Sequence, residues 1–150
     1  MALGLLKDSS MSKITFGDEQ IKSFERRRPT RILIVESDAP VREGLARALK
    51  LECYEVSTAV NGSEALGRHD DFSQIDAVLL DLDLADEHRW QAVRQLSSAN
   101  PLLSVIGMTA RPTRHALADA ADLEAVIEKP FEVPALLRIL NGAQSLSVLN

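Results

Sequence analysis

Five short runs of strand-forming residues, separated by segments of helical spacing, limit the folds open to this chain. The runs are Arg31–Val35, Tyr54–Ala59, Ala77–Leu80, Leu102–Met108 and Leu123–Ile127. They are too short for independent helices, and most are rich in the apolar and β-branched residues that favour strands. Helical segments are predicted around 39–49, 63–66, 90–96, 113–121 and 133–140. This alternation predicts an α/β fold with a doubly wound, mainly parallel sheet, for which the flavodoxin-like order 2-1-3-4-5 is the commonest small topology.

The chain divides into one folded domain and two shorter ends. Residues 1–29 show no sustained periodicity and end in a triple arginine before Pro29, so we interpret them as a flexible extension. Residues 30–141 form the predicted domain, and residues 142–150 form a short tail. No stretch approaches the ~20 apolar residues of a membrane span, and the first residues do not resemble a secretory signal. We therefore expect a cytoplasmic protein.

Charge and cysteine content exclude several classes of function. The net charge is −5, which disfavours general electrostatic binding to nucleic acid or to an anionic membrane. The single cysteine, Cys53, excludes an internal disulfide framework and a cysteine-based zinc site. We interpret Cys53 as a small buried hydrophobe in a reducing compartment.

Polar residues stand where four of the predicted strands end. They are Glu36, Asp81, Thr109 and Lys129. Taken alone, Asp81 could equally well be a cap for the next helix. In the predicted strand order the four strands are neighbours, so their carboxyl ends share one edge of the sheet, where open α/β sheets bind their ligands. The four residues together therefore predict a functional site.

The residue types at this edge fit phosphoryl chemistry. Two carboxylates, Glu36 and Asp81, could hold a hard divalent cation such as Mg²⁺. A carboxylate can also attack phosphorus to give an aspartyl phosphate, while the Lys129 ammonium and the Thr109 hydroxyl stabilise the phosphoryl oxygens. No glycine-rich P-loop is present, which disfavours nucleotide binding of the Walker type.

At these residues the sequence resembles the receiver domain of bacterial two-component response regulators. The resemblance covers about 30–140, and its strongest matches are Ile32-Leu33-Ile34-Val35-Glu36, Asn61-Gly62-Ser63-Glu64-Ala65-Leu66, Leu79-Leu80-Asp81-Leu82, Met108-Thr109-Ala110 and Lys129-Pro130-Phe131. It implies that Asp81 is the phosphoacceptor and Glu36 a metal ligand. It further implies that Thr109 is the hydroxyl that closes on the phosphoryl group, that Lys129 is its cationic partner, and that the Lys129–Pro130 bond is cis.

The resemblance also implies a signalling protein and not an enzyme. Its partners would be a histidine kinase or phosphotransfer protein and a downstream protein target, with self-association into a homodimer left open. Binding to nucleic acid or membrane is not expected.

The sequence departs from the family pattern at several positions. A second acidic residue is usual after the first strand, but here it is Ser37, which should weaken Mg²⁺ binding; Asp83 could replace the missing carboxylate in the metal site. The loop after Asp81 has Ala85 and Arg89 where proline and glycine are common. Val126 replaces the aromatic switch residue on the fifth strand.

These departures leave three hypotheses about function open. The first is a receiver that is phosphorylated on Asp81 and signals by protein contact. The second is a pseudo-receiver that works as a protein-interaction module without phosphate, which Ser37 and Val126 favour. The third is a flavodoxin-like protein that binds a small ligand at the same edge.

Overall fold

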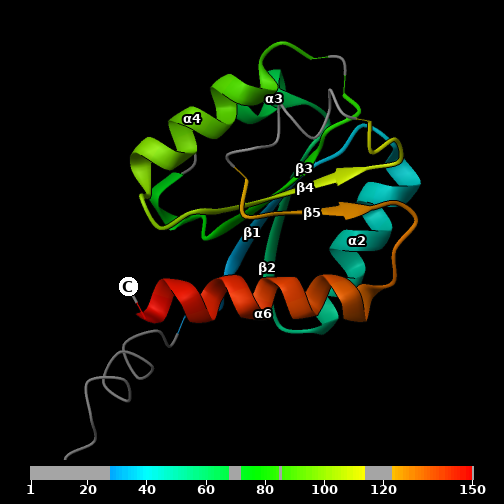
Figure 1. Ribbon diagram of the computed structural model, residues 1–150. Helices are drawn as coiled ribbons and strands as arrows, with labels where there is room; N and C mark the ends of the chain where they lie inside the picture. The colour runs from blue at the N-terminus through cyan, green and yellow to red at the C-terminus, as the bar shows by residue number, and fades with distance from the viewer. Residues whose placement is uncertain (1–27, 68–71, 85, 114–122, 150) are drawn as a thin grey trace, which may run out of the picture.

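The structure, a computed structural model, is a three-layer α/β sandwich described at residues 28–67, 72–84, 86–113 and 123–149. Its strands are β1 (Arg31–Val35), β2 (Glu55–Ala59), β3 (Ala77–Asp81), β4 (Ser104–Thr109) and β5 (Ala125–Glu128). Its helices are α2 (Ala39–Leu51), α3 (Gly62–Gly67), α4 (Arg89–Ala99) and α6 (Val133–Leu149), with a 3-10 turn η1 (Phe72–Gln74). Helices α2 and α6 cover one face of the sheet, and α3 and α4 cover the other (Figure 1).

The sheet has the predicted topology. Its five strands are in the order β2-β1-β3-β4-β5, and every pair is parallel. Val35 of β1 is level with Leu80 of β3, and Leu80 is level with Gly107 of β4. The strands therefore end beside one another, and the residues that follow them share one edge. We call this edge the carboxyl rim.

Alternating side chains of the central strands enter two separate cores. On β1, Leu33 and Val35 belong to the cluster beneath α3 and α4, whereas Ile32 and Ile34 belong to the cluster beneath α2 and α6. Strands β3 and β4 are buried along their whole length. Parallel strands covered on both faces read as continuous apolar runs, which is why they were predictable from the sequence.

Several element boundaries differ from the prediction. Strand β4 begins at Ser104 because the amides of Leu102 and Leu103 bond to the side chain and backbone of Asn100, which form a turn instead of a ladder. Helix α6 continues through Asn141 and Gly142 to Leu149, well past the predicted end at 140. A single glycine lowers helix stability by only about 1 kcal/mol, which does not stop a helix by itself. The helix predicted at 113–121 lies almost entirely outside the described residues.

The prediction that Cys53 is buried is wrong. Cys53 is exposed, and it has a left-handed backbone with φ of 70°. It lies two residues past the end of α2, where its amide donates to the Lys50 carbonyl and the Tyr54 amide donates to the Leu49 carbonyl. This hydrogen-bond pattern closes a helix with a left-handed residue. Cys53 is therefore in the cap of the helix and not in its apolar face.

At the amino ends of the strands, one carboxylate accepts three hydrogen bonds. Asp76, just before β3, accepts from both terminal nitrogens of Arg28 at 3.0 and 3.1 Å and from the amide of Arg31 at 2.9 Å. Arg28 is thus paired, although we had interpreted the triple arginine as part of a flexible extension. No helix in the described part of the chain is both long and apolar enough to cross a membrane.

Candidate functional site

The sheet brings the predicted site residues to the carboxyl rim. Asp81 and Thr109 are the last residues of β3 and β4, and Glu36 follows β1 directly. Their exposed fractions are 3%, 0% and 1%. Lys129 follows β5 and is partly exposed, and the Lys129–Pro130 bond is cis, as predicted. Three buried polar residues at neighbouring strand ends need partners, because an unpaired polar group is costly to bury.

Lys129 joins the two carboxylates of the rim. Its Nζ lies 2.7 Å from Glu36 Oε1 and 3.3 Å from Asp81 Oδ1. The other Glu36 oxygen accepts from the Asp38 amide at 3.0 Å. We call Glu36, Asp81 and Lys129 the ion-pair cluster. It places one cation between two carboxylates, so it carries an excess of negative charge.

This excess charge agrees with the pKa directions in the cluster. Burial raises the pKa of the Glu36 carboxyl, with a smaller contribution from the Asp81 charge, and the hydrogen bonds from Lys129 and Asp38 only partly offset it. For Lys129, burial acts to lower the pKa. The hydrogen bond to Glu36 and the charges of Asp81 and Glu36 outweigh burial, so the pKa of the ammonium is raised. Both groups therefore hold their protons more tightly than in water.

The donor set at the rim fits Mg²⁺ with two carboxylates. Glu36 Oε1 and Asp81 Oδ1 both contact the Lys129 ammonium, so the two carboxylates lie close together at the rim. Mg²⁺ is commonly bound by one or two carboxylates together with water and phosphate oxygens. Among the described residues, no three His, Cys, Asp or Glu side chains form a group that could hold a metal ion. The third predicted ligand, Asp83, has other contacts.

Asp83 binds to the end of β4. Its Oδ1 accepts from the Thr109 hydroxyl and its Oδ2 from the Ala110 amide, both at 2.7 Å. We call Asp83, Thr109 and Ala110 the Asp83 cluster. The Asp83 amide in turn donates to Asp81 Oδ1 at 3.0 Å, so the two clusters touch. Burial acts to raise the pKa of Asp83, but the bonds from Ala110 and Thr109 outweigh it and hold this pKa below its ordinary value.

The loop between β3 and α4 is held by two residues that sequence reasoning did not assign. Asp86 accepts from the amides of Gly62 and Ser63 at the start of α3. Arg89 donates to the carbonyls of Leu82 and Leu84. The only sequence signal was Arg89 itself, which replaces the glycine usual in the family. The unusual loop is therefore fixed by side chains that bond to backbone groups.

The side chains at and beside the remaining departures from the family pattern lie outside the ion-pair cluster. Ser37 is exposed. Asp38 caps α2 by accepting from the Val41 amide at 3.3 Å. Val126 is half-buried on β5 and packs against the core beneath α3 and α4. None of these side chains adds a charge to the ion-pair cluster.

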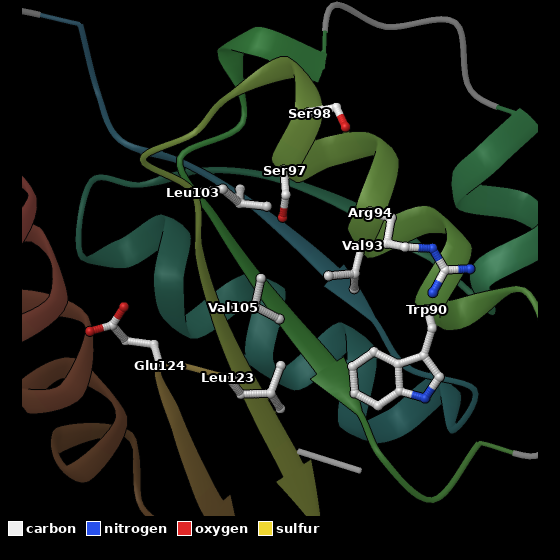
Figure 2. Close-up of a pocket in the computed structure, with 9 residues that line it drawn as sticks. All are labelled: Trp90, Val93, Arg94, Ser97, Ser98, Leu103, Val105, Leu123 and Glu124. Atoms are coloured by element: carbon white, nitrogen blue, oxygen red, sulfur yellow. The ribbon is translucent and has the colours of Figure 1, made fainter. Parts of the chain in front are cut away.

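A pocket of about 740 Å³ lies along α4 (Figure 2), and no residue of either cluster lines it. Its lining comes from α4, from β4 and the turn before it, and from the segment before β5. It consists of Trp90, Val93, Arg94, Ser97, Ser98, Leu103, Val105, Leu123 and Glu124. Trp90 also packs against the core beneath α4. No residue of the rim lines this pocket. The pocket is therefore not the small-ligand site that the flavodoxin-like hypothesis placed at the rim.

Comparison with known proteins identifies relatives of the whole fold. Residues 32–141 match the family model described as the response regulator receiver domain. The response regulator MprA of Mycobacterium sp. (strain KMS) is 35% identical over 111 residues, which are 73% of this chain and 48% of the relative. The MprA of Mycobacterium avium (strain 104) is 34% identical over 109 residues, or 71% and 47%. The matched region thus spans about half the length of these relatives.

Solved structures of response regulator receivers are also similar to this chain. The receiver protein TrrA of Thermotoga maritima, solved in complex with Mg²⁺ and BeF, has a TM-score of 0.64 at 26% identity and covers 76% of this chain and 98% of its own. A CheY-like receiver domain from Methanospirillum hungatei has a TM-score of 0.69 at 22% identity and covers 79% and 96%. At that lower identity the likeness concerns the fold alone.

Proposed function

The chain belongs to the response regulator receiver domain family, and from that membership we propose that it accepts a phosphoryl group on Asp81 and passes the signal on by protein contact. The observation that carries the proposal is the position of Lys129, 2.7 Å from Glu36 and 3.3 Å from Asp81. A carboxylate nucleophile, a cation and a buried hydroxyl at Thr109 are groups suited to phosphoryl transfer. The donor would be a phosphohistidine on a histidine kinase or phosphotransfer protein of the cytoplasm.

The transfer step follows from the positions of these groups. An Asp81 oxygen attacks phosphorus, the bond from phosphorus to the donor nitrogen breaks, and its electron pair stays on that nitrogen, which is protonated. Lys129 and Thr109 then donate to phosphoryl oxygens, where negative charge develops. Attack by water on phosphorus later releases inorganic phosphate and restores the Asp81 carboxylate.

Glu36 and Asp81 are the residues that would hold Mg²⁺, with water completing its coordination. When bound, the ion would neutralise charge on the phosphoryl oxygens during transfer. The exposed Ser37 contributes no charge to this position. We therefore expect weaker Mg²⁺ binding than in a receiver with a second acidic residue at that place.

Phosphorylation can be tested with a small donor. The full chain is incubated with phosphoramidate and Mg²⁺ and analysed by intact mass. Wild type should gain one phosphoryl group, and Asp81→Asn should gain none. Glu87→Gln, which removes an exposed charge from the loop after β3, is the matched control and should behave as wild type. A wild-type chain that stays unmodified at high donor concentration would contradict the proposal.

A second candidate is a receiver that signals without phosphate. It is favoured by a specific observation, the engagement of Thr109 by Asp83 at 2.7 Å, which occupies the hydroxyl that a phosphoryl group would use. The test is genetic. If deletion of the gene gives a phenotype and Asp81→Ala restores normal behaviour, the phosphate-free function is correct. If Asp81→Ala behaves like the deletion, it is wrong.

A further inference from the structure

Asp83 holds two donors that lie beside the phosphoacceptor. Thr109 is the last residue of β4 and Ala110 follows it; β4 pairs with β3, and Asp81 is level with Met108. The Leu82 amide also donates to the Met108 carbonyl at 2.8 Å, so the chain after Asp81 runs along the end of β4. A hydroxyl and an amide next to the acceptor are donors of the kind that stabilise phosphoryl oxygens. In this structure both donate to the Asp83 carboxylate.

The Thr109 hydroxyl cannot serve two acceptors at once. It has one proton, which it gives to Asp83 Oδ1 at 2.7 Å, and its oxygen accepts from the Arg111 amide at 3.0 Å. The side chain is completely buried, which limits its freedom to turn elsewhere. The Ala110 amide likewise has one proton, which it gives to Asp83 Oδ2 at 2.7 Å. A phosphoryl group could use these donors only after Asp83 leaves.

The contact is also of the strong kind. Both hydrogen bonds have an ionised acceptor, and such bonds are shorter and about twice as strong as neutral ones. The Asp83 amide donates to Asp81 Oδ1 at 3.0 Å, which holds the backbone of Asp83 over the acceptor. The backbone amide of Asp83 is thus held by Asp81, and its side-chain carboxylate is held by Thr109 and Ala110. Its carboxylate resembles a phosphoryl group in presenting anionic oxygens to a hydroxyl and an amide.

We propose that the Asp83 carboxylate is a built-in substitute for the phosphoryl group. It keeps Thr109 and Ala110 engaged in the absence of phosphate, and it competes with a phosphoryl group on Asp81 for the same two donors. This inference rests on the proposed function in that it takes Asp81 as the acceptor. It assigns Asp83 the role of an internal anion that regulates the acceptor site, in place of the metal ligand that the sequence suggested.

The contact can be tested without any phosphoryl donor. Amide spectra and hydrogen exchange of the ¹⁵N-labelled full chain are compared for wild type, Asp83→Ala, Asp83→Asn and the control Glu87→Gln. Loss of the carboxylate should move the Ala110 and Arg111 amide signals and speed exchange at Ala110 about tenfold or more, as expected for a lost bond to a charged group. Asp83→Asn should give a smaller change of the same sign, and Glu87→Gln none. Thermal unfolding of each variant shows that it is folded.

The competition is tested with beryllofluoride and Mg²⁺, a mimic of the bound phosphoryl group. Asp83→Ala should bind it about tenfold more tightly than wild type, and Glu87→Gln should bind it as wild type does. Unchanged Ala110 and Arg111 amides in Asp83→Ala would overturn the inference. The inference would also be overturned if Asp83→Ala bound beryllofluoride no more tightly than wild type. This holds whether both proteins bind it or neither does.

The two proposals fail in different ways. A wild-type chain that gains no phosphoryl group from phosphoramidate counts against the proposed function. The inference on Asp83 still requires the shifted amides and the gain of beryllofluoride binding in Asp83→Ala, and their presence supports it independently.

Discussion

The ion-pair cluster and the Asp83 cluster lie at the same rim but are built in opposite ways. In the ion-pair cluster, Lys129 is one cation between two carboxylates. In the Asp83 cluster, a single carboxylate lies between two neutral donors, a hydroxyl and an amide. The first joins strand ends β1, β3 and β5, and the second joins a loop to the end of β4. Charge thus dominates one side of the rim, and directed hydrogen bonds dominate the other.

The two clusters differ in which groups can change partners. Lys129 contacts two carboxylates, so its ammonium can bind a third anion while it keeps one of these contacts. Thr109 has one proton and one anionic acceptor, so any new acceptor must displace Asp83. We expect the ion-pair cluster to contribute mainly to stability and metal binding, and the Asp83 cluster to control access to the phosphoryl position.

The largest effect should come from removing the shared cation. Lys129→Met leaves Glu36 and Asp81 facing each other at the buried rim and should lower the free energy of unfolding by about 3 kcal/mol, the scale for breaking a buried ion pair. Urea denaturation at neutral pH measures it. The double variant Lys129→Met/Asp81→Asn should recover part of the loss, because one of the repelling charges is gone. A loss below about 1 kcal/mol would show that the cluster behaves as an exposed pair.

A smaller loss is expected when the hydroxyl of the Asp83 cluster is removed. Thr109→Val keeps the shape of the buried side chain but removes the donor to Asp83 and the acceptor for Arg111, and should cost about 1–2 kcal/mol. Thr109→Ser keeps the hydroxyl and is the matched control. If Thr109→Val were as stable as Thr109→Ser in chemical denaturation, the contact with Asp83 would contribute nothing to stability.

Asp86 extends the comparison to another carboxylate in the loop after β3. Burial acts to raise its pKa, but the amides of His88, Gly62 and Ser63 outweigh it and hold this pKa below its ordinary value. Asp86→Ala should cost about 1 kcal/mol, as for other capping carboxylates. Because the folded pKa is depressed, this contribution is full above the unfolded pKa of about 4 and disappears as pH falls through the lower folded value. Denaturation from pH 7 to pH 3 should show the two proteins converging; a constant difference would contradict the capping role.

The smallest effect on stability, and the clearest test of the metal site, is expected at Ser37. Because the side chain is exposed, Ser37→Asp should change the free energy of unfolding by no more than about 0.5 kcal/mol. It should tighten Mg²⁺ binding several-fold in a calorimetric titration, because it adds a carboxylate beside Glu36. Ser37→Asn is the neutral control. Equal affinity in all three proteins would place the metal away from Glu36.

The sequence was most informative where a local pattern decides the structure. The alternation of strand and helix patterns predicted a parallel sheet, and the commonest small topology of such sheets, which the structure confirms, placed Glu36, Asp81 and Lys129 at one edge. The cap of α2 is equally local, because the Asp38 side chain accepts from the Val41 amide only three residues away. These predictions depended on periodicity and on neighbours in the chain.

Contacts between distant segments were not predictable in the same way. The bonds from Ala110 to Asp83 and from Gly62 to Asp86 depend on the path of the loop after β3, which no periodicity encodes. The left-handed backbone of Cys53 was missed because glycine is the usual signal for that position. The Asp83 carboxylate was therefore assigned to a metal by proximity to Asp81 in the sequence, whereas the fold turns it toward β4.

The pairing of Arg28 with Asp76 has a practical consequence for studying partners of this receiver. It fastens the chain at the amino ends of β1 and β3, the pole of the sheet opposite Glu36 and Asp81. A fluorophore, affinity handle or immobilising tether joined ahead of Arg28 therefore departs from that pole. A chain attached to a sensor surface in this way would present its carboxyl rim outward, accessible from solution.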